Sequence, residues 1–170
     1  MKKIEIKNNS ELYQGDVSIT VFNNGIPYKK IRQHNAGTAD FFEYILNCIR
    51  GTDVSKSIPA YIYACSDTEG AVPVTNFGTL TEGTPELTVN YSTTNPSASL
   101  KYIFLIPGVV IPSDKNVINS FALKDLQNKK IYATVSLDES LEINNADINT
   151  NILVEWNLSI FNSTSQMQLE

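Results

Sequence analysis

The sequence predicts a mainly β protein, an antiparallel sandwich or barrel with one inserted α-helix at about residues 38–50. Three observations lead to this prediction. Short apolar runs with a period of two recur along the chain, and turn residues separate them. One segment carries the start, the period and the stop of a helix. Because no second helix alternates with the strand runs, a parallel α/β sheet is excluded.

The predicted helix has a capping residue at its start and a glycine after its end. Thr38 can cap the first turn with its hydroxyl, and Asp40 lies where the helix dipole favours negative charge. Gly51 can adopt the left-handed conformation that ends many helices. Four apolar residues recur with helical spacing: Phe42, Ile45, Leu46 and Ile49. We expect this face to cover a sheet or to close one end of the β structure.

The strands are predicted from alternation and from the turns between them. An alternating run over residues 17–21 is followed by Asn23-Asn24-Gly25 and by a second extended run through Ile31. Asn-Gly between two such runs is a strong hairpin signal, because both turn residues tolerate positive φ. Further strands are expected at residues 58–65, 87–91, 100–106, 118–123, 130–137 and 151–162, with a weaker one at 72–74 or 79–81.

The last predicted strand alternates most regularly, and it defines the expected core. Alternate positions are apolar and share one face: Ile152, Val154, Trp156, Leu158 and Ile160. We expect the Trp156 face to be buried against Val17, Ile19 or Val135 from other strands. No linker or repeat interrupts the chain, so we expect a single domain over residues 1–162 and a polar tail at 163–170.

Composition and charge favour a folded protein that does not bind nucleic acid. The 170 residues are 42% hydrophobic and 18% charged, with a net charge of −5, and the basic run at residues 29–32 is too short to reverse that balance. No apolar run reaches the ~20 residues of a membrane helix, and residues 1–7 lack an apolar signal core. We therefore expect synthesis in a cytoplasm and no membrane partner. Cys48 and Cys65 lack metal-ligand spacing, and two buried thiols are expected.

The sequence contains no recognisable catalytic arrangement, so we expect neither enzymatic activity nor a cofactor. His34, the sole histidine, lies at a strand-to-helix junction, where its ring is expected to bond a backbone group. An acidic loop lacks the ligand order and the central glycine of an EF-hand, which favours a solvated loop over a loosely held calcium ion. Its carboxylates belong to Asp138, Glu139, Glu142 and Asp147.

Several segments, taken in order, resemble small virion structural proteins of tailed bacteriophages, notably the auxiliary (decoration) capsid proteins of crAss-like phages. The resemblance extends over about residues 17–162. It rests on five segments: Asn35-Ala36-Gly37-Thr38 opening a helix with Phe42 that closes at Gly51, then residues 102–107, 118–123, 133–137 and 152–159.

The resemblance implies an antiparallel, jelly-roll-like β-sandwich that docks on an assembled shell in symmetric copies. It implies no active-site residues. The expected partners are the major capsid protein or other virion proteins, together with further copies of this chain, a trimer being one arrangement. The expected location is the virion, assembled in the cytoplasm of a bacterial host.

The irregular segment at residues 66–85 is the predicted contact element. It is rich in glycine and proline, yet it carries four apolar residues: Val72, Val74, Phe77 and Leu80. A long segment of this kind is more often functional than filler. The equally weighted alternative is that these side chains fold the segment onto its own domain.

A second functional interpretation is a carbohydrate-binding module of a head fibre or adhesin. Its site would combine the segment at residues 66–85 with an aromatic surface. The candidate aromatic residues are Tyr61, Tyr63, Tyr91, Tyr102 and Phe104. Aromatic stripes on strands are more often part of the packing than a ligand platform, so this interpretation comes second.

Overall fold

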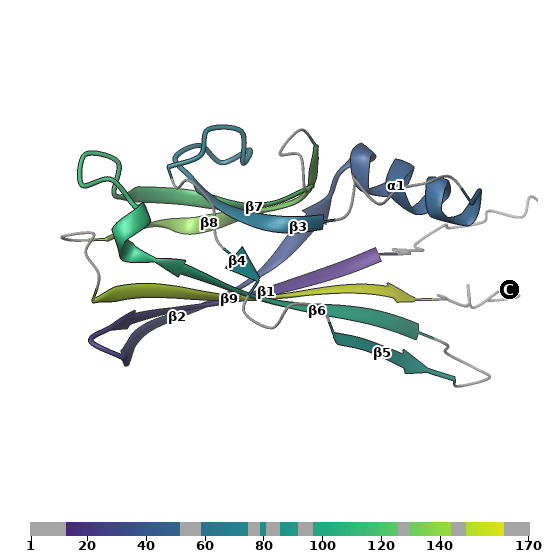
Figure 1. Ribbon diagram of the computed structural model, residues 1–170, viewed down its shortest axis with the longest axis horizontal. Helices are drawn as coiled ribbons and strands as arrows, with labels where there is room; N and C mark the ends of the chain where they lie inside the picture. The colour runs from purple at the N-terminus through teal and green to yellow at the C-terminus, as the bar shows by residue number, and fades with distance from the viewer. Residues whose placement is uncertain are drawn as a thin grey trace, which may run out of the picture.

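The computed structural model describes residues 13–51, 59–74, 79–80, 86–91, 97–125, 130–143 and 149–161 (Figure 1). In chain order the elements are β1 (Tyr13–Asn23), β2 (Ile26–Gly37), α1 (Ala39–Ile49), β3 (Pro59–Cys65), β4 (Thr79–Leu80), β5 (Glu86–Asn90), β6 (Ser97–Pro107), the short 3-10 helix η1 (Gly108–Val110), β7 (Val117–Asp125), β8 (Ile131–Glu142) and β9 (Thr150–Phe161). Within these ranges no helix has the length and apolar character needed to cross a membrane.

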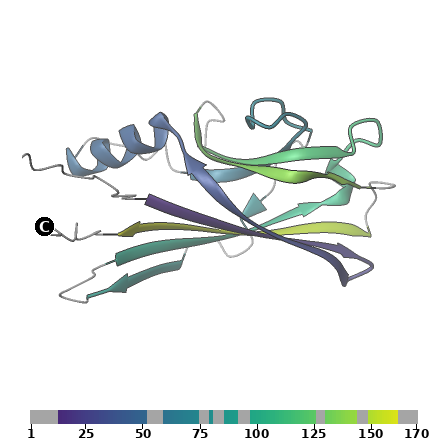
Figure 2. The same ribbon diagram turned by 180° about the vertical axis from the view of Figure 1, so that it is seen from behind.

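The strands form two antiparallel sheets that share β2 (Figures 1 and 2). The first sheet has the order β2-β1-β9-β6, and β5 and β4 pair with successive parts of β6. In the second sheet the end of β2 is followed by β8, β7 and β3. The predicted mainly β architecture, an antiparallel sandwich with one helix in the described part of the chain, is therefore confirmed.

β2 passes from one sheet to the other near its C-terminal end. It pairs with β1 as far as Asn35, which lies opposite Gly15, and residues 36–37 then pair with residues 133–134 of β8. The side chain of Asn35 occupies the space beside Gly15, since a Cβ atom added there would overlap with Oδ1 of Asn35. The absence of a side chain at position 15 therefore permits the pairing at this corner.

The first hairpin turns at the residues that the sequence predicts. Asn24 has φ of 51° and Gly25 has φ of 76°. Positive φ at both central residues is the geometry that matches the twist of a two-residue hairpin. Pro59 likewise begins β3, where its missing N–H removes least from the sheet.

The core lies between the two sheets, and β9 crosses its centre. Trp156 is fully buried and pairs with Val17 of β1 on one side and Tyr102 of β6 on the other. Val154 pairs in the same way with Ile19, and the partner on its other side is Phe104. Val135 of the second sheet belongs to the same core. The alternation predicted for this strand is thus confirmed, and Val17 and Ile19 lie beside the Trp156 face as its cross-strand neighbours.

Replacement of Trp156 by alanine tests this arrangement. We expect the Trp156→Ala protein to lose about 3–5 kcal/mol of unfolding free energy, because the surrounding strands cannot collapse into the space left. Thermal and denaturant unfolding measure the loss. Val109→Ala is the control, because Val109 is 62% exposed. A melting temperature within about one or two degrees of the parent protein would contradict the central position of Trp156.

Candidate functional site

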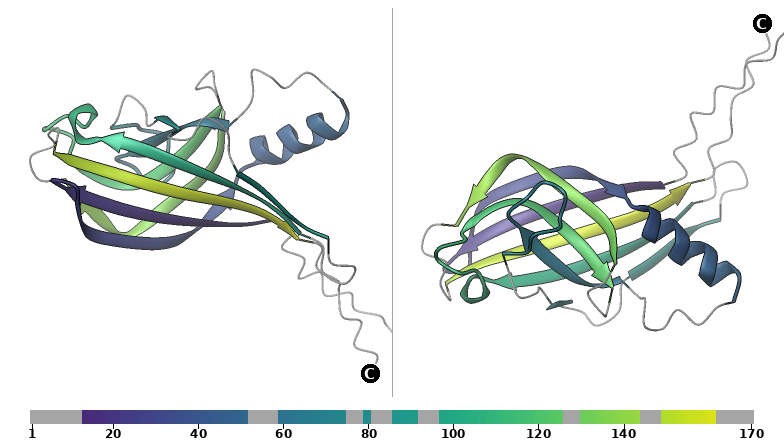
Figure 3. Two further views of the ribbon diagram at one scale, coloured as in Figure 1. Left: turned by 60° about the horizontal axis from the view of Figure 1, so that its bottom comes forward. Right: turned by 90° about the horizontal axis from the view of Figure 1, so that it is seen from above.

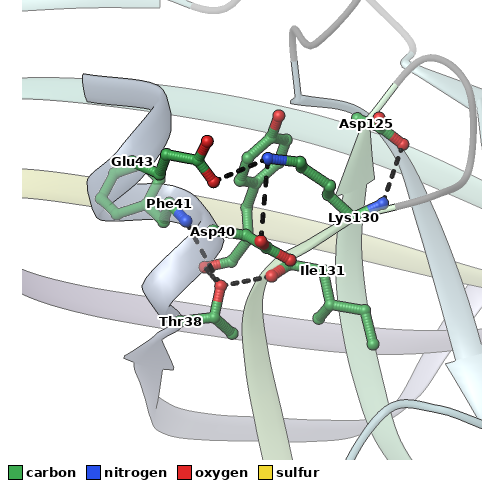
Figure 4. Close-up of polar contacts among 8 residues, drawn as sticks. Thr38, Asp40, Phe41, Glu43, Asp125, Lys130 and Ile131 are labelled. Carbon is green, nitrogen blue, oxygen red and sulfur yellow. Dashed lines mark hydrogen bonds and ion pairs between the residues drawn. The ribbon is translucent and has the colours of Figure 1, made fainter. Parts of the chain in front are cut away.

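Helix α1 is fixed to the second sheet by the residue that caps it. The backbone N–H of Thr38 donates to the carbonyl of Tyr132 at 2.9 Å, and its hydroxyl donates to the carbonyl of Ile131 (Figure 4). The same hydroxyl oxygen accepts a hydrogen bond from the backbone N–H of Phe41 at 3.4 Å. The predicted cap is confirmed, and it also joins the start of the helix to β8.

Lys130 ties the exposed side of the first helical turns to the same region (Figure 4). Its Nζ atom lies 2.8 Å from Oε2 of Glu43 and 3.8 Å from Oδ1 of Asp40. Its backbone N–H donates to Oδ1 of Asp125 at 3.2 Å. The hydrogen bond from Lys130 lowers the pKa of Glu43, and the same bond raises the pKa of Lys130. Such exposed pairs add little stability.

The apolar face predicted for the helix differs from the face that packs. Phe41 is buried, and Tyr44 and Ile45 pack partly buried against the core, with the rings of Phe41 and Tyr44 centred 6.5 Å and 5.4 Å from that of Tyr132. By contrast, the exposed fractions are 46%, 64% and 78% for Phe42, Leu46 and Ile49. The prediction was wrong for these three residues because the helix is apolar on two sides, and its spacing alone does not say which side faces the core.

β5 also leaves apolar side chains exposed. Leu87 is 63% exposed and Val89 40% exposed, and Tyr91, just after the strand, is 87% exposed. Leu87 pairs with Leu100, which packs against the core, so β5 extends the inner side of the first sheet beyond the cover of the second. No described strand pairs with the other edge of β5.

The exposed apolar residues of α1 and β5 lie at one end of the molecule. Both elements are at the right in Figure 1 and at the right in both views of Figure 3, whereas η1 is at the opposite end. We call the exposed apolar residues of these two elements together the apolar end: Phe42, Leu46 and Ile49 on α1, and Leu87, Val89 and Tyr91 at β5. The sequence shows the apolar character of these residues but gives no signal that they are exposed.

The first part of the predicted contact segment is folded onto the outer face of the second sheet. Ser120 and Ser136 donate from their hydroxyls to the carbonyls of Asp67 and Thr68, each at 2.6 Å. Gly70 fits closely over the sheet, because a Cβ atom there would lie 2.9 Å from Cβ of Ala122. Its φ of 76° is also a conformation that favours glycine. The loop is therefore held to the sheet by both hydrogen bonds and packing.

Asp67 organises this loop from within. Its carboxylate accepts hydrogen bonds from the backbone N–H groups of Glu69, Ala71 and Val72, at 3.2, 2.9 and 2.8 Å. Slight burial raises the pKa of Asp67, but the backbone hydrogen bonds outweigh this effect and the net pKa is lowered. The ionised carboxylate thus favours the folded loop.

The four predicted contact residues have different environments. Val74 is 4% exposed, and its N–H donates to the carbonyl of Ala64 at 2.8 Å, so it folds the segment onto its own domain. Val72 is 55% exposed and remains available for contact. Phe77 lies outside the described residues. Leu80 is part of β4, and its side chain is not among those described.

The aromatic residues do not form one surface. Tyr102 and Phe104 are buried and stack with ring centres 5.8 Å apart. Tyr63 is also buried, beneath Nζ of Lys124 at 4.8 Å from its ring centre, and Tyr61 is only partly exposed. Tyr91 is the one fully exposed member of the predicted set. The aromatic surface expected for a sugar site is therefore not assembled.

Three polar predictions need correction. His34 is exposed and its Nδ1 lies 2.7 Å from Oδ1 of Asp16, so its partner is a carboxylate on β1 rather than a backbone group. The acidic residues at 138, 139 and 142 are in β8 rather than in a loop, and Asp147 lies outside the described residues. Cys48 is exposed rather than buried. Cys65 is buried as expected, and burial raises the pKa of its thiol to about 11.

Among the described residues no group of three or more His, Cys, Asp or Glu side chains is placed to hold a metal ion. Comparison with protein-family models, with curated proteins and with solved structures gives no match.

Removal of the Asp67 carboxylate should loosen the loop in a pH-dependent way. The folded-state pKa is below the ordinary value of 3.8, so the stabilisation is present above that value and is lost as pH falls through the folded pKa. We expect the Asp67→Ala protein to melt below the parent at about pH 7, and the difference to shrink towards about pH 3.

Glu69→Ala is the matched control, since it removes a neighbouring exposed carboxylate that accepts no hydrogen bond from a described residue. A melting difference that is the same for both variants, or that does not change with pH, would contradict the role assigned to Asp67.

Proposed function

We propose that this protein is a non-enzymatic phage virion protein, an auxiliary protein that binds the outer surface of a capsid through its apolar end. There it stabilises the shell or presents a surface to the host. The observation that carries the proposal is the exposure of Phe42, Leu46 and Ile49 on a helix held in a fixed orientation. The capsid as partner rests on the resemblance of the sequence to decoration proteins.

Apolar side chains exposed to water on a protein surface favour binding to a partner that covers them. Burying one large apolar side chain contributes about 1.5–3 kcal/mol relative to its exposure to water. Binding must also overcome the loss of translational and rotational freedom, so an ordered surface binds better than a flexible one. The hydrogen bonds of Thr38 and the packing of Phe41 and Tyr44 on Tyr132 supply that order at α1.

β5 adds a second means of attachment at the same end. Its outer edge faces no described strand, and an extended segment of a partner can pair with such an edge through backbone hydrogen bonds. Exposed edges with apolar side chains are usually protected in soluble proteins. Coverage by a shell protein, or by a second copy of this chain, would provide that protection.

A charge placed on the helix should abolish docking without unfolding the protein. We expect Leu46→Glu to weaken binding to capsids that lack this protein by about tenfold or more, because the carboxylate would lose its hydration in the contact. Co-sedimentation of purified protein with such capsids measures the binding.

Val109→Glu is the matched control, because Val109 is 62% exposed against 64% for Leu46 and lies at the opposite end, in η1. Equal co-sedimentation of the parent and both variants would contradict docking through the apolar end. Absence of co-sedimentation by the parent would contradict the proposed function itself.

We also expect the protein to self-associate, with a trimer on the shell as the expected arrangement. A closed symmetric assembly would cover apolar residues that a monomer leaves exposed. Light scattering over a range of protein concentrations tests association in solution, and a map of the virion tests it on the particle. A monomer in solution that also occupies the shell as isolated, non-touching copies would contradict this expectation.

A further inference from the structure

The outer face of the first sheet contains a hollow of about 620 Å³. Unlike the apolar end, it is lined mostly by polar and charged residues. Side chains of β1, β2, β6 and β9 surround it. Apart from Val17 its lining residues are all polar or charged, and the imidazole of His34 is their one aromatic ring. Its volume is within the ~300–1,000 Å³ typical of small-molecule sites.

Strand register creates the hollow. Ser18 on β1 lies between Arg32 on β2 and Glu155 on β9. Its short side chain forms a floor between two long ones. In the neighbouring row, Asp16 lies between His34 and Asn157. The positions project to the outer face because Val17 and Trp156, one residue away on the same strands, point into the core.

The carboxylates around the hollow have partners, whereas two of its cations have none in the described part of the chain. Oδ1 of Asp16 lies 2.7 Å from Nδ1 of His34, and Oε1 of Glu155 lies 2.9 Å from Nζ of Lys101. With His34 counted as neutral, three cations, Lys30, Arg32 and Lys101, face these two carboxylates. Lys30 and Arg32 line the same hollow, and neither has an ion-pair or hydrogen-bond partner among the described residues. A local excess of positive charge therefore faces the hollow in a chain whose net charge is −5.

The floor of the hollow also holds an unsatisfied polar atom. The Oγ atom of Ser18 is buried and has no hydrogen-bond partner among the described residues. A buried hydroxyl without a partner is unfavourable, and rotation of this short side chain towards a bound molecule that offers a donor or an acceptor would relieve it. Ser18, Lys30 and Arg32 would therefore all be satisfied by a ligand that carries polar groups on every side.

We propose that this hollow binds an acidic sugar of the uronic acid class. The carboxylate of the sugar would be bound by Arg32 and Lys30, and its hydroxyls would hydrogen-bond to Glu155, Asn157 and Ser18. A single negative charge suits the site better than a polyanion, because two carboxylates also line the hollow. The described lining residues include no Phe, Tyr or Trp, and their one ring, that of the exposed His34, is held by Asp16, so a nucleotide base would lack a large stacking surface.

Titration with matched ligands tests the assignment. The probes are methyl glucuronide, methyl glucoside, which lacks the carboxylate, and acetate, which lacks the hydroxyls. Amide shifts in nuclear magnetic resonance spectra locate binding, and their saturation gives Kd. We expect methyl glucuronide to shift Ser18, Arg32 and Asn157, and we expect both partial ligands to bind at least about tenfold more weakly.

Two variants distinguish specific binding in the hollow from general attraction between the acidic ligand and surface arginines. Arg32→Gln should weaken glucuronide binding by about tenfold or more, whereas Arg50→Gln removes an exposed arginine at the end of α1 and should leave it unchanged. Both positions are exposed, so both variants should fold, and their spectra verify this. Equal losses in the two variants, equal binding of acetate and glucuronide, or an absence of saturable shifts at the hollow would each overturn the proposal.

Discussion

The structure depends on the passage of one strand, β2, between the two sheets. The strand pairs with β1 for most of its length and with β8 at its end. Gly15 makes room for Asn35 at the point of transfer. Immediately afterwards Thr38 donates two hydrogen bonds to β8 and begins the helix. Over four residues, 35–38, the chain fixes the position of both sheets and the direction of α1.

The attachment of the helix just after this corner determines which of its side chains are exposed. Because Thr38 joins the helix to β8 at its first turn, the residues that reach Tyr132 are Phe41 and Tyr44. Phe42 and Leu46 are then turned away from the sheet and remain exposed. Burial, followed by the hydrogen bond with Cys48, raises the pKa of Tyr44 to about 12, as expected for a phenol on the packed side of the helix. The orientation of the apolar end is thus a consequence of backbone geometry, not of its own contacts.

The sequence predicts those features that local physics determines. The cap at Thr38, the turn at Asn24 and Gly25 and the alternation of β9 each depend on neighbours within a few residues, and each is confirmed. The buried side of the helix depends instead on where β8 lies, and two apolar sides satisfy the same period. The acidic end of β8 was predicted to be a loop because its strand is exposed there and lacks alternation. The local sequence pattern therefore determines neither which side of the helix is buried nor how far β8 extends.

The candidate sites were hard to predict for the same reason. The pairing of His34 with Asp16 joins residues on adjacent strands and depends on their register. The hollow also requires β9 and β6 in register with these two strands, so that Ser18 lies between Arg32 and Glu155 and Lys101 lies close by. A shift of one residue in β1 would exchange Ser18 for Val17 and turn a polar floor into an apolar one. No sequence pattern within a single strand identifies such a site.

The two proposed surfaces differ in how water is removed from them. The apolar end gains stability when a protein surface excludes water from Leu46 and Ile49, and it needs a large partner to do so. The hollow holds charged groups that are well hydrated when empty, so it binds favourably only a ligand that replaces those hydrogen bonds one by one. The first surface is therefore suited to permanent assembly. The second is suited to a small polar molecule that exchanges with solvent, and it is built at outward positions of strands whose inward neighbours, Val17 and Trp156, form the rigid core.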